Sequence, residues 1–321
     1  MRFPSAGLLT SLVAAAPMML AGCGKPKSTT KTPADGGSAQ SEATSGKAVT
    51  IHYSDIPVTL RQEARVDFTT TGGGAYAQAT LDVRSDLTLR GENDTVEVGW
   101  KVVSLADMTL DGSLAGGKSE DTQDYVRGQG VGAWVISRSG IIDLRKSDGH
   151  PANTKRLSAL AAIDTEIAER RAAGEQDVLP PPGAALLKLL PELLELPRLP
   201  AEPIQVGASV ETQEIHETAL TGTEYVIPTE TTVRYTLVSM QSGAGIRLAE
   251  ISFEAEDWGG IDLEEGEVVL KNATEGSMLF DVDRGVPVNL NFTREESLVA
   301  GEISYDTTKI VTATFELVDP A

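Results

Sequence analysis

Residues 77–89 read Ala77-Gln-Ala-Thr-Leu-Asp-Val-Arg-Ser-Asp-Leu-Thr-Leu89, with an apolar side chain at every second position except Ser85. Successive side chains of a β-strand point to opposite faces, so this period of two predicts a long strand with one buried and one solvated face. Strands of this length favour antiparallel meander connections over βαβ crossovers.

The same period continues on both sides of this stretch. Residues 58–68 and 95–103 alternate in the same way, and Gly72-Gly-Gly74 and Gly91-Glu-Asn-Asp94 supply the turns between the strands. Shorter strands are predicted near 124–127, 132–137 and 140–145. Beyond Gly207 we predict further strands at 208–220, 223–240, 244–258, 266–271, 276–283, 286–293 and 298–318.

Two helices interrupt the strands. Thr154–Ala172 places Leu157, Leu160, Ile163 and Ile167 at steps of three and four, which predicts an amphipathic helix. Ala184–Leu196 contains seven leucines, and prolines at 191, 197 and 200 bend and close it. The predicted fold is therefore mainly β, with long antiparallel strands in a curved sheet or half-barrel and two helices between two β segments.

The leucine-rich helix has two interpretations. In the first it is a core helix that packs on the sheet. In the second it lies in the concave face of the curved sheet and lines an apolar cavity. The residues that would then contact an apolar ligand are Leu186, Leu187, Leu190, Leu193 and Leu194.

The two β segments carry a similar phrase. Residues 134–144 and 279–290 each pair two short strands around an Arg/Gly turn. Two similar β halves are one explanation, and independent hairpins are the other.

Composition argues against several functions. The formal net charge of −20 repels nucleic-acid phosphates, and no cluster of Lys and Arg offsets it. His52, His150 and His216 lack zinc-like spacing, and neither a nucleophile elbow nor a phosphate-binding loop is present. The acidic stretch Glu254–Glu267 indicates a solvated edge more than a calcium loop. We expect a protein that is not an enzyme, with no metal and no cofactor.

The N-terminus indicates the compartment. Arg2 precedes an apolar run from Ala6 to Leu20 of signal-peptide length, too short for a comfortable membrane span. The run ends in Leu20-Ala-Gly-Cys23, which resembles the lipobox of bacterial lipoproteins. The resemblance implies cleavage after Gly22 and acylation of Cys23, the only cysteine in the chain, with lipid chains such as palmitate.

These features divide the chain into three regions. Residues 1–22 are the predicted signal peptide, and 23–48, which lack large apolar side chains, are a lipidated flexible tether. Residues 49–321 are the β-rich body: a first β segment at 49–150, a helical insert at 151–200 and a second β segment at 201–321. Because residue 24 is Gly rather than Asp, the sorting rule of enterobacterial lipoproteins implies the outer membrane in a Gram-negative host.

The predicted architecture resembles the lipoprotein-carrier half-barrels of the bacterial envelope, which are LolA- and LolB-like. Residues 200–209, Pro-Ala-Glu-Pro-Ile-Gln-Val-Gly-Ala-Ser, are also similar to a phrase of uncharacterised bacterial lipoprotein families. The resemblance implies a membrane-anchored envelope protein that binds a lipid or another apolar ligand. The alternatives are an envelope scaffold that meets a protein or polysaccharide partner, and a hydrolase with paired carboxylates.

Overall fold

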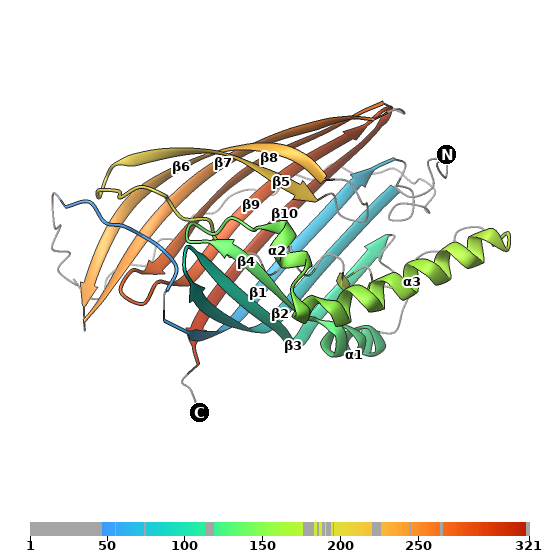
Figure 1. Cartoon of the computed structure of the whole chain (residues 1–321), viewed down its shortest axis with the longest axis horizontal. Helices are drawn as coiled ribbons and strands as arrows, with labels where there is room; N and C mark the ends of the chain where they lie inside the picture. Colours follow the sequence, from blue (N-terminus) through green and yellow to red (C-terminus); the bar gives the residue numbers. More distant parts are fainter. Residues whose placement is uncertain are drawn as a thin grey trace, which may run out of the picture.

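A computed structural model of the chain describes residues 47–318, except 55, 74, 113–118, 176–182, 185, 188–189, 191–193, 195, 220–225, 244 and 264–265. Within this part, ten antiparallel strands form one curved, unclosed sheet (Figure 1). The prediction of a mainly β protein built on a curved antiparallel sheet is confirmed.

The sheet consists of two meanders that meet in its middle. Its order is β4-β3-β2-β1-β10-β9-β8-β7-β6-β5. The strands are β1 Val58–Gly72, β2 Ala75–Glu92, β3 Thr95–Gly112, β4 Val131–Ser137, β5 Ser209–Ala219, β6 Val226–Gly243, β7 Ile246–Leu263, β8 Gly266–Asp281, β9 Val286–Ala300 and β10 Ile303–Leu317. The pairing of β1 with β10, in which Val66 lies opposite Val311, joins the two meanders into one sheet.

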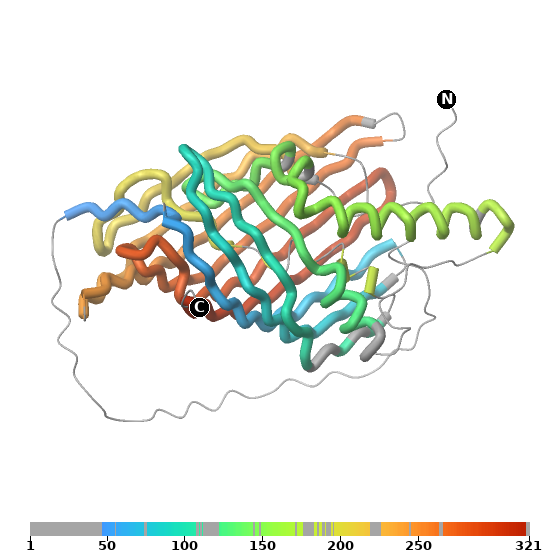
Figure 2. The backbone as a smooth tube through the Cα atoms, turned by 60° about the horizontal axis from the view of Figure 1, so that its bottom comes forward, coloured from blue at the N-terminus to red at the C-terminus, as the bar shows by residue number. Residues whose placement is uncertain are grey.

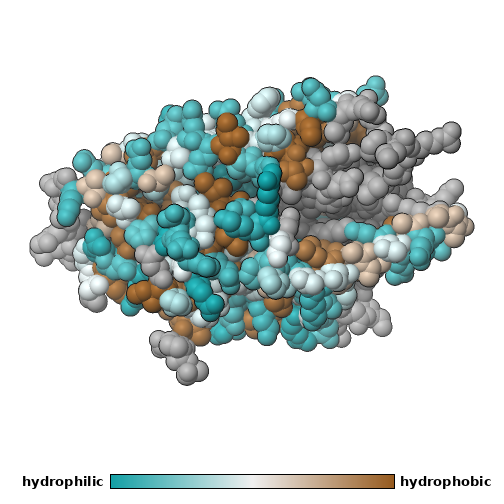
Figure 3. Space-filling model, in the orientation of Figure 1, coloured by the Kyte–Doolittle hydropathy of each residue, from teal (hydrophilic) through white to brown (hydrophobic). Residues whose placement is uncertain are grey.

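The concave face carries the core. On β2 the alternating residues 77–89 are buried, as the sequence pattern predicts, and the residues between them face solvent. Inward-facing side chains from the strands form one continuous cluster with Leu186, Leu187, Leu190 and Leu194. On the face that Figure 3 shows, hydrophilic residues predominate and hydrophobic residues form small separate patches.

The helices lie between the two meanders in the chain. They are α1 Ser119–Gln129, α2 Leu144–Asp148, the 3-10 turn η2 Pro151–Asn153 and α3 Thr154–Ala172. The predicted helix at 154–172 is confirmed with both of its ends. In Figures 1 and 2, α3 projects beyond the sheet, and most of its residues after Leu160 are exposed.

Two of the predicted short strands are wrong. Residues 124–127 belong to α1, in which Thr122 and Val126 are buried one helical turn apart, a period that four residues alone cannot show. Residues 140–145 form only an isolated bridge between Ile142 and Ile136, and Asp143 then caps α2 by accepting from the Lys146 amide. The predicted strand at 132–137 is confirmed as β4.

Two other predicted boundaries are corrected. The predicted strands 266–271 and 276–283 are one strand, β8, because the residues between them, 272–275, also pair with β9. The predicted strand 298–318 belongs to two strands, the end of β9 and the whole of β10. The turn between them includes Gly301, which adopts a positive φ of 61°.

The phrase shared by the two β segments marks different places in the sheet. Residues 134–144 run from the edge strand β4 into α2, whereas 279–290 form the β8–β9 hairpin inside the second meander. The two phrases are therefore not equivalent structural positions.

Candidate ligand site

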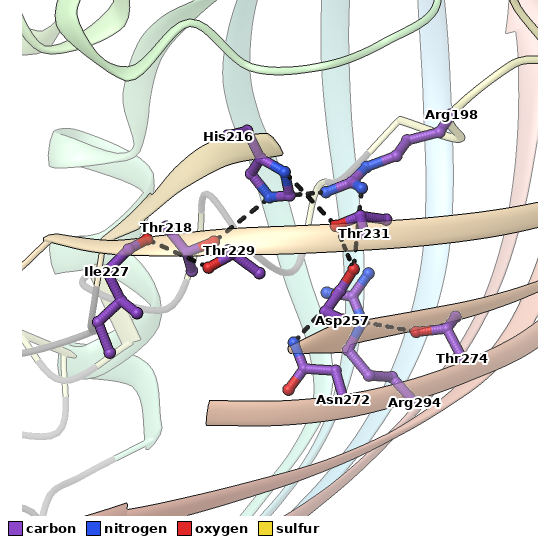
Figure 4. A network of polar contacts seen from close by, with 10 residues as sticks. All are labelled: Arg198, His216, Thr218, Ile227, Thr229, Thr231, Asp257, Asn272, Thr274 and Arg294. Atoms are coloured by element: carbon purple, nitrogen blue, oxygen red, sulfur yellow. Dashed lines mark hydrogen bonds and ion pairs between the residues drawn. The ribbon is translucent and has the colours of Figure 1, made fainter. Parts of the chain in front are cut away.

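A group of polar side chains interrupts the apolar concave face (Figure 4). We call it the concave polar cluster; its members are Arg198, His216, Thr218, Thr231, Asp257, Asn272, Thr274 and Arg294. Strand pairing aligns part of it, because Thr231 lies opposite Asp257 and Asp257 lies opposite Asn272. Arg198 enters from the segment that follows the leucines and points toward His216 and Asp257.

The cluster contains a directional chain of hydrogen bonds. The Thr231 hydroxyl donates to Asp257 Oδ1 at 2.5 Å, so its oxygen can accept from His216 Nδ1 at 3.4 Å. This arrangement assigns the proton to Nδ1 and leaves Nε2 of a neutral imidazole as an acceptor. Arg198 Nη2 lies 3.5 Å from that Nε2. The chain of hydrogen bonds therefore runs from Arg198 through His216 and Thr231 to Asp257.

The two charged ends of this hydrogen-bond chain, Arg198 and Asp257, differ in the length of their hydrogen bonds. Asp257 also accepts from Asn272 Nδ2 at 3.2 Å, so both carboxylate oxygens have hydrogen bonds. Arg198 has five N–H donors, but among the described residues its closest polar contacts are 3.5 Å to His216 and 4.0 Å to Asp257. Charge-assisted N–H···O bonds are usually about 2.7–2.9 Å long. Among the described residues, the contacts of Arg198 are thus longer than ordinary charge-assisted bonds, whereas each oxygen of Asp257 accepts one hydrogen bond.

Burial shifts the ionisation of three neighbouring groups. Burial, and then the positive charge of Arg198, lower the pKa of His216 below its ordinary 6.5, against the opposing effect of Asp257. Burial raises the pKa of Glu214, which lies on the same strand as His216, while Arg198 opposes that rise. Burial also raises the pKa of Tyr235. At neutral pH His216 is therefore uncharged, and among the described residues the ion-pair partner of Arg198 is Asp257 at 4.0 Å.

A small cavity lies beside the cluster. Its volume is about 40 Å³, enough for a few water molecules. Its charged lining residues are Arg198, Asp257 and Arg294. Its apolar lining residues include Leu196, Val233, Tyr235, Phe253, Ala255, Leu290 and Phe292. The cavity is therefore lined by both charged and apolar side chains.

The structure places four of the five predicted lining leucines in the core. Leu186, Leu187, Leu190 and Leu194 are each no more than 1% exposed, and Leu193 lies outside the described residues. The cavity begins only at Leu196, beyond them. The described leucines therefore fill the concave face in this state.

The remaining predicted residues lie elsewhere. Cys23 and Gly22 lie outside the described residues. His52 is exposed between buried Ile51 and Tyr53, and His150 lies in the predicted turn with Nε2 3.3 Å from Glu97 Oε2. Of the acidic stretch, Glu254 and Glu256 face solvent, whereas Asp257 joins the cluster. In the described part of the chain, no three His, Cys, Asp or Glu side chains are placed to hold a metal ion.

The sequence carried a weak signal for this cluster. Asp257 has the same parity along β7 as Phe253 and Ala255, so alternation alone directs its carboxylate to the buried face. A charged residue with inward parity indicates a buried polar partner. Arg198 has no such signal, because it lies in the irregular Pro197–Pro200 segment and its position depends on tertiary packing.

Acidification should destabilise the protein through His216. The unfolded histidine binds a proton near pH 6.5 and the folded one only at lower pH, so stability is lost as pH falls below about 6.5. We expect His216→Gln to lose less unfolding free energy than the wild type between about pH 7.5 and pH 5.5. Urea unfolding measures this difference, with the exposed His52→Gln as the control; equal pH slopes for all three proteins would refute it.

Comparison with known proteins adds no family. No protein-family model matches the sequence, and no curated protein matches it. In the described part of the chain, no helix has the length and apolar character needed to cross a membrane.

Proposed function

We propose that the chain is a non-enzymatic lipoprotein of the bacterial cell envelope, anchored through Cys23, whose β body binds a lipid or another apolar ligand. The observation that carries the proposal is the way the concave face is covered. Described leucines of the segment 183–199, rather than a second sheet, pack in the same buried cluster as the inward-facing strand residues. A leucine side chain and an acyl chain present the same chemistry to such a face.

The observed cavity is too small to hold a lipid unaided. A cavity of about 150 Å³ holds benzene, and the one beside Leu196 has about 40 Å³. A ligand must therefore displace part of the leucine segment. Exposing four buried leucines costs about 6–12 kcal/mol, and burying an acyl chain returns about 0.8 kcal/mol per CH₂. On these magnitudes a chain of about sixteen carbons returns about 13 kcal/mol and offsets the whole range of this cost, whereas a chain of about eight returns about 6 kcal/mol and reaches only its lower end.

The sequence supports the placement of this body at a membrane. The lipobox-like Leu20-Ala-Gly-Cys23 and the polar tether after it suit a domain held next to a bilayer, where lipid ligands are found. In a Gram-negative host that membrane would be the outer membrane.

Binding can be tested on a chain that begins at residue 24. This chain keeps every described helix and strand, all of which lie at or beyond Val58. We expect a fluorescent fatty acid of about eighteen carbons to bind with enhanced emission, and palmitate to compete far better than octanoate because of the burial difference above. Native mass spectrometry should also detect co-purifying lipid.

Two results would contradict this proposal. One is an absence of probe binding by a chain whose circular dichroism shows intact β structure. The other is equal competition by octanoate and palmitate, because displacement of the leucines requires a long chain.

A second candidate function is an envelope scaffold without a small-molecule ligand. The observation that favours it is the packing of Leu186, Leu187, Leu190 and Leu194, which fill the described core next to them. A scaffold would show no chain-length preference and no co-purifying lipid, so the same experiment separates the two functions.

A further inference from the structure

Arg198 combines partial burial and positive charge with polar contacts that, in the described part of the chain, are all long. Its side chain is 26% exposed, and its described polar contacts lie at 3.5 Å and 4.0 Å. A guanidinium offers a rigid fork that matches the two oxygens of a carboxylate or phosphate. A partly buried fork whose contacts with the described residues are long is suited to bind such a group.

The surroundings of Arg198 favour an acceptor over a donor. Both oxygens of Asp257 already accept hydrogen bonds, from Thr231 and Asn272. Neutral His216 accepts from the arginine without neutralising it. Two arginines, Arg198 and Arg294, and one carboxylate, Asp257, line the cavity, so a cationic ligand would meet a net positive lining. An anionic group can bind the Arg198 donors and leave the Asp257 hydrogen bonds to Thr231 and Asn272 intact.

The apolar side of the cavity continues from this point into the core. Phe253, Leu290 and Phe292 line the same space as the Arg198 side chain, and all three belong to the main core cluster or pack against it. A ligand whose head contacts Arg198 would therefore direct its apolar part toward the leucine-covered concave face. Amphipathic sites commonly combine an apolar lining with a few fixed polar groups in this way.

We propose that Arg198 binds the anionic head, a carboxylate or a phosphate, of an amphipathic ligand whose acyl chain enters the concave face beside Leu196. This proposal rests on the proposed apolar-ligand function and names the ligand class for the same site. Thr274 and Arg294, joined by an Nε–Oγ1 hydrogen bond of 3.1 Å, also line this cavity.

A matched ligand pair tests the head group separately from the tail. cis-Parinaric acid and its methyl ester share one fluorescent chain and differ only at the head, where the ester replaces the charged carboxylate by an uncharged methyl carboxylate group. We expect the wild-type chain that begins at residue 24 to bind the acid about tenfold or more tightly than the ester, as for hydrogen bonds to charged groups. Equal affinity for acid and ester would overturn the anionic-head proposal and leave the apolar-ligand function standing.

Variants locate the effect at Arg198. Arg198→Met should weaken binding of the acid by about tenfold or more and leave the ester unchanged, and Arg198→Lys should recover part of the loss. The control is Arg145→Gln, which removes a guanidinium from an 85% exposed side chain paired with Glu217. Equal loss of acid and ester in Arg198→Met, in a folded protein, would show a merely structural arginine and overturn the proposal.

Competition distinguishes the two anionic heads. Palmitate and hexadecyl phosphate should each displace parinaric acid more strongly than hexadecanol, and the stronger of the two identifies the preferred head. Displacement by hexadecanol equal to that by both anions would contradict the proposal. Failure of parinaric acid and its ester to bind at all would instead count against the apolar-ligand function itself.

Discussion

Replacing Asn153 by alanine should lower the free energy of unfolding by about 3 kcal/mol, because three buried hydrogen bonds would be lost together. Asn153 is 3% exposed. Its Oδ1 accepts from the Ala133 amide at 3.0 Å, and its Nδ2 donates to the carbonyls of Ala133 at 2.9 Å and Ser147 at 2.6 Å. The alanine variant would leave these three backbone groups unsatisfied unless water enters.

At the free edge of β4, the Asn153 side chain makes the hydrogen bonds to Ala133 that a neighbouring strand would otherwise make. Further along the same edge, Val135 N–H donates to Ser147 Oγ at 2.9 Å and Ser137 N–H donates to the Ile141 carbonyl at 2.8 Å. Side chains and a loop thus satisfy an edge that would otherwise be open to pairing with another chain. Loss of Asn153 should therefore also increase aggregation.

Urea and thermal unfolding measure the Asn153 effect, and light scattering measures aggregation. Asn153→Asp should be destabilising as well, because a carboxylate cannot donate to the two carbonyls and would be buried with a charge. The control is Asn291→Ala, at an exposed position on β9. A stability change in Asn153→Ala no larger than that of the control would refute the role of this side chain.

The sequence allows the architecture to be predicted because each long strand shows the alternation of apolar and polar residues over many consecutive positions. Residues 77–89 alternate, and the structure buries the expected side on β2. The helix at 154–172 is predictable for the same reason, since its period extends over several turns. The pattern fails where a segment is short, as at 124–127, or where the buried face is itself polar.

The polar middle of β8 shows why the site is harder to predict than the fold. Asn272 and Thr274 interrupt the apolar alternation, so the sequence suggests a break between two strands. In the structure β8 is continuous there, and the same residues belong to the concave polar cluster. A polar interruption on the inward parity of a long strand is thus a signal for a buried site.

The tertiary structure brings together site residues that are far apart in the sequence. Arg198 and His216 are 18 residues apart in the sequence, and Asp257 lies on another strand. Their proximity depends on the curvature of the sheet and on the path of the segment after Leu196. Neither the curvature nor the path of this segment has a local sequence signature, so Arg198 could not be assigned to the site from the sequence.

Replacing Cys23 by serine should abolish the proposed lipid anchor completely. The thioether needs the cysteine sulfur, and Cys23 is the only cysteine of the chain, so no other residue can take the diacylglyceryl group. Each acyl CH₂ buried in the bilayer contributes about 0.8 kcal/mol, so two or three chains hold the protein effectively permanently. We therefore expect an all-or-none loss of incorporated palmitate.

Metabolic labelling with an alkyne-tagged palmitate and intact-mass measurement test this anchor. The wild type should carry the label and begin at Cys23, because cleavage after Gly22 follows lipid transfer in proteins with this lipobox. Cys23→Ser should be unlabelled, whereas Ser28→Ala, the control in the predicted tether, should match the wild type. A labelled Cys23→Ser protein, or an unlabelled wild type, would remove the anchor and with it the reason to place this β body beside a lipid source.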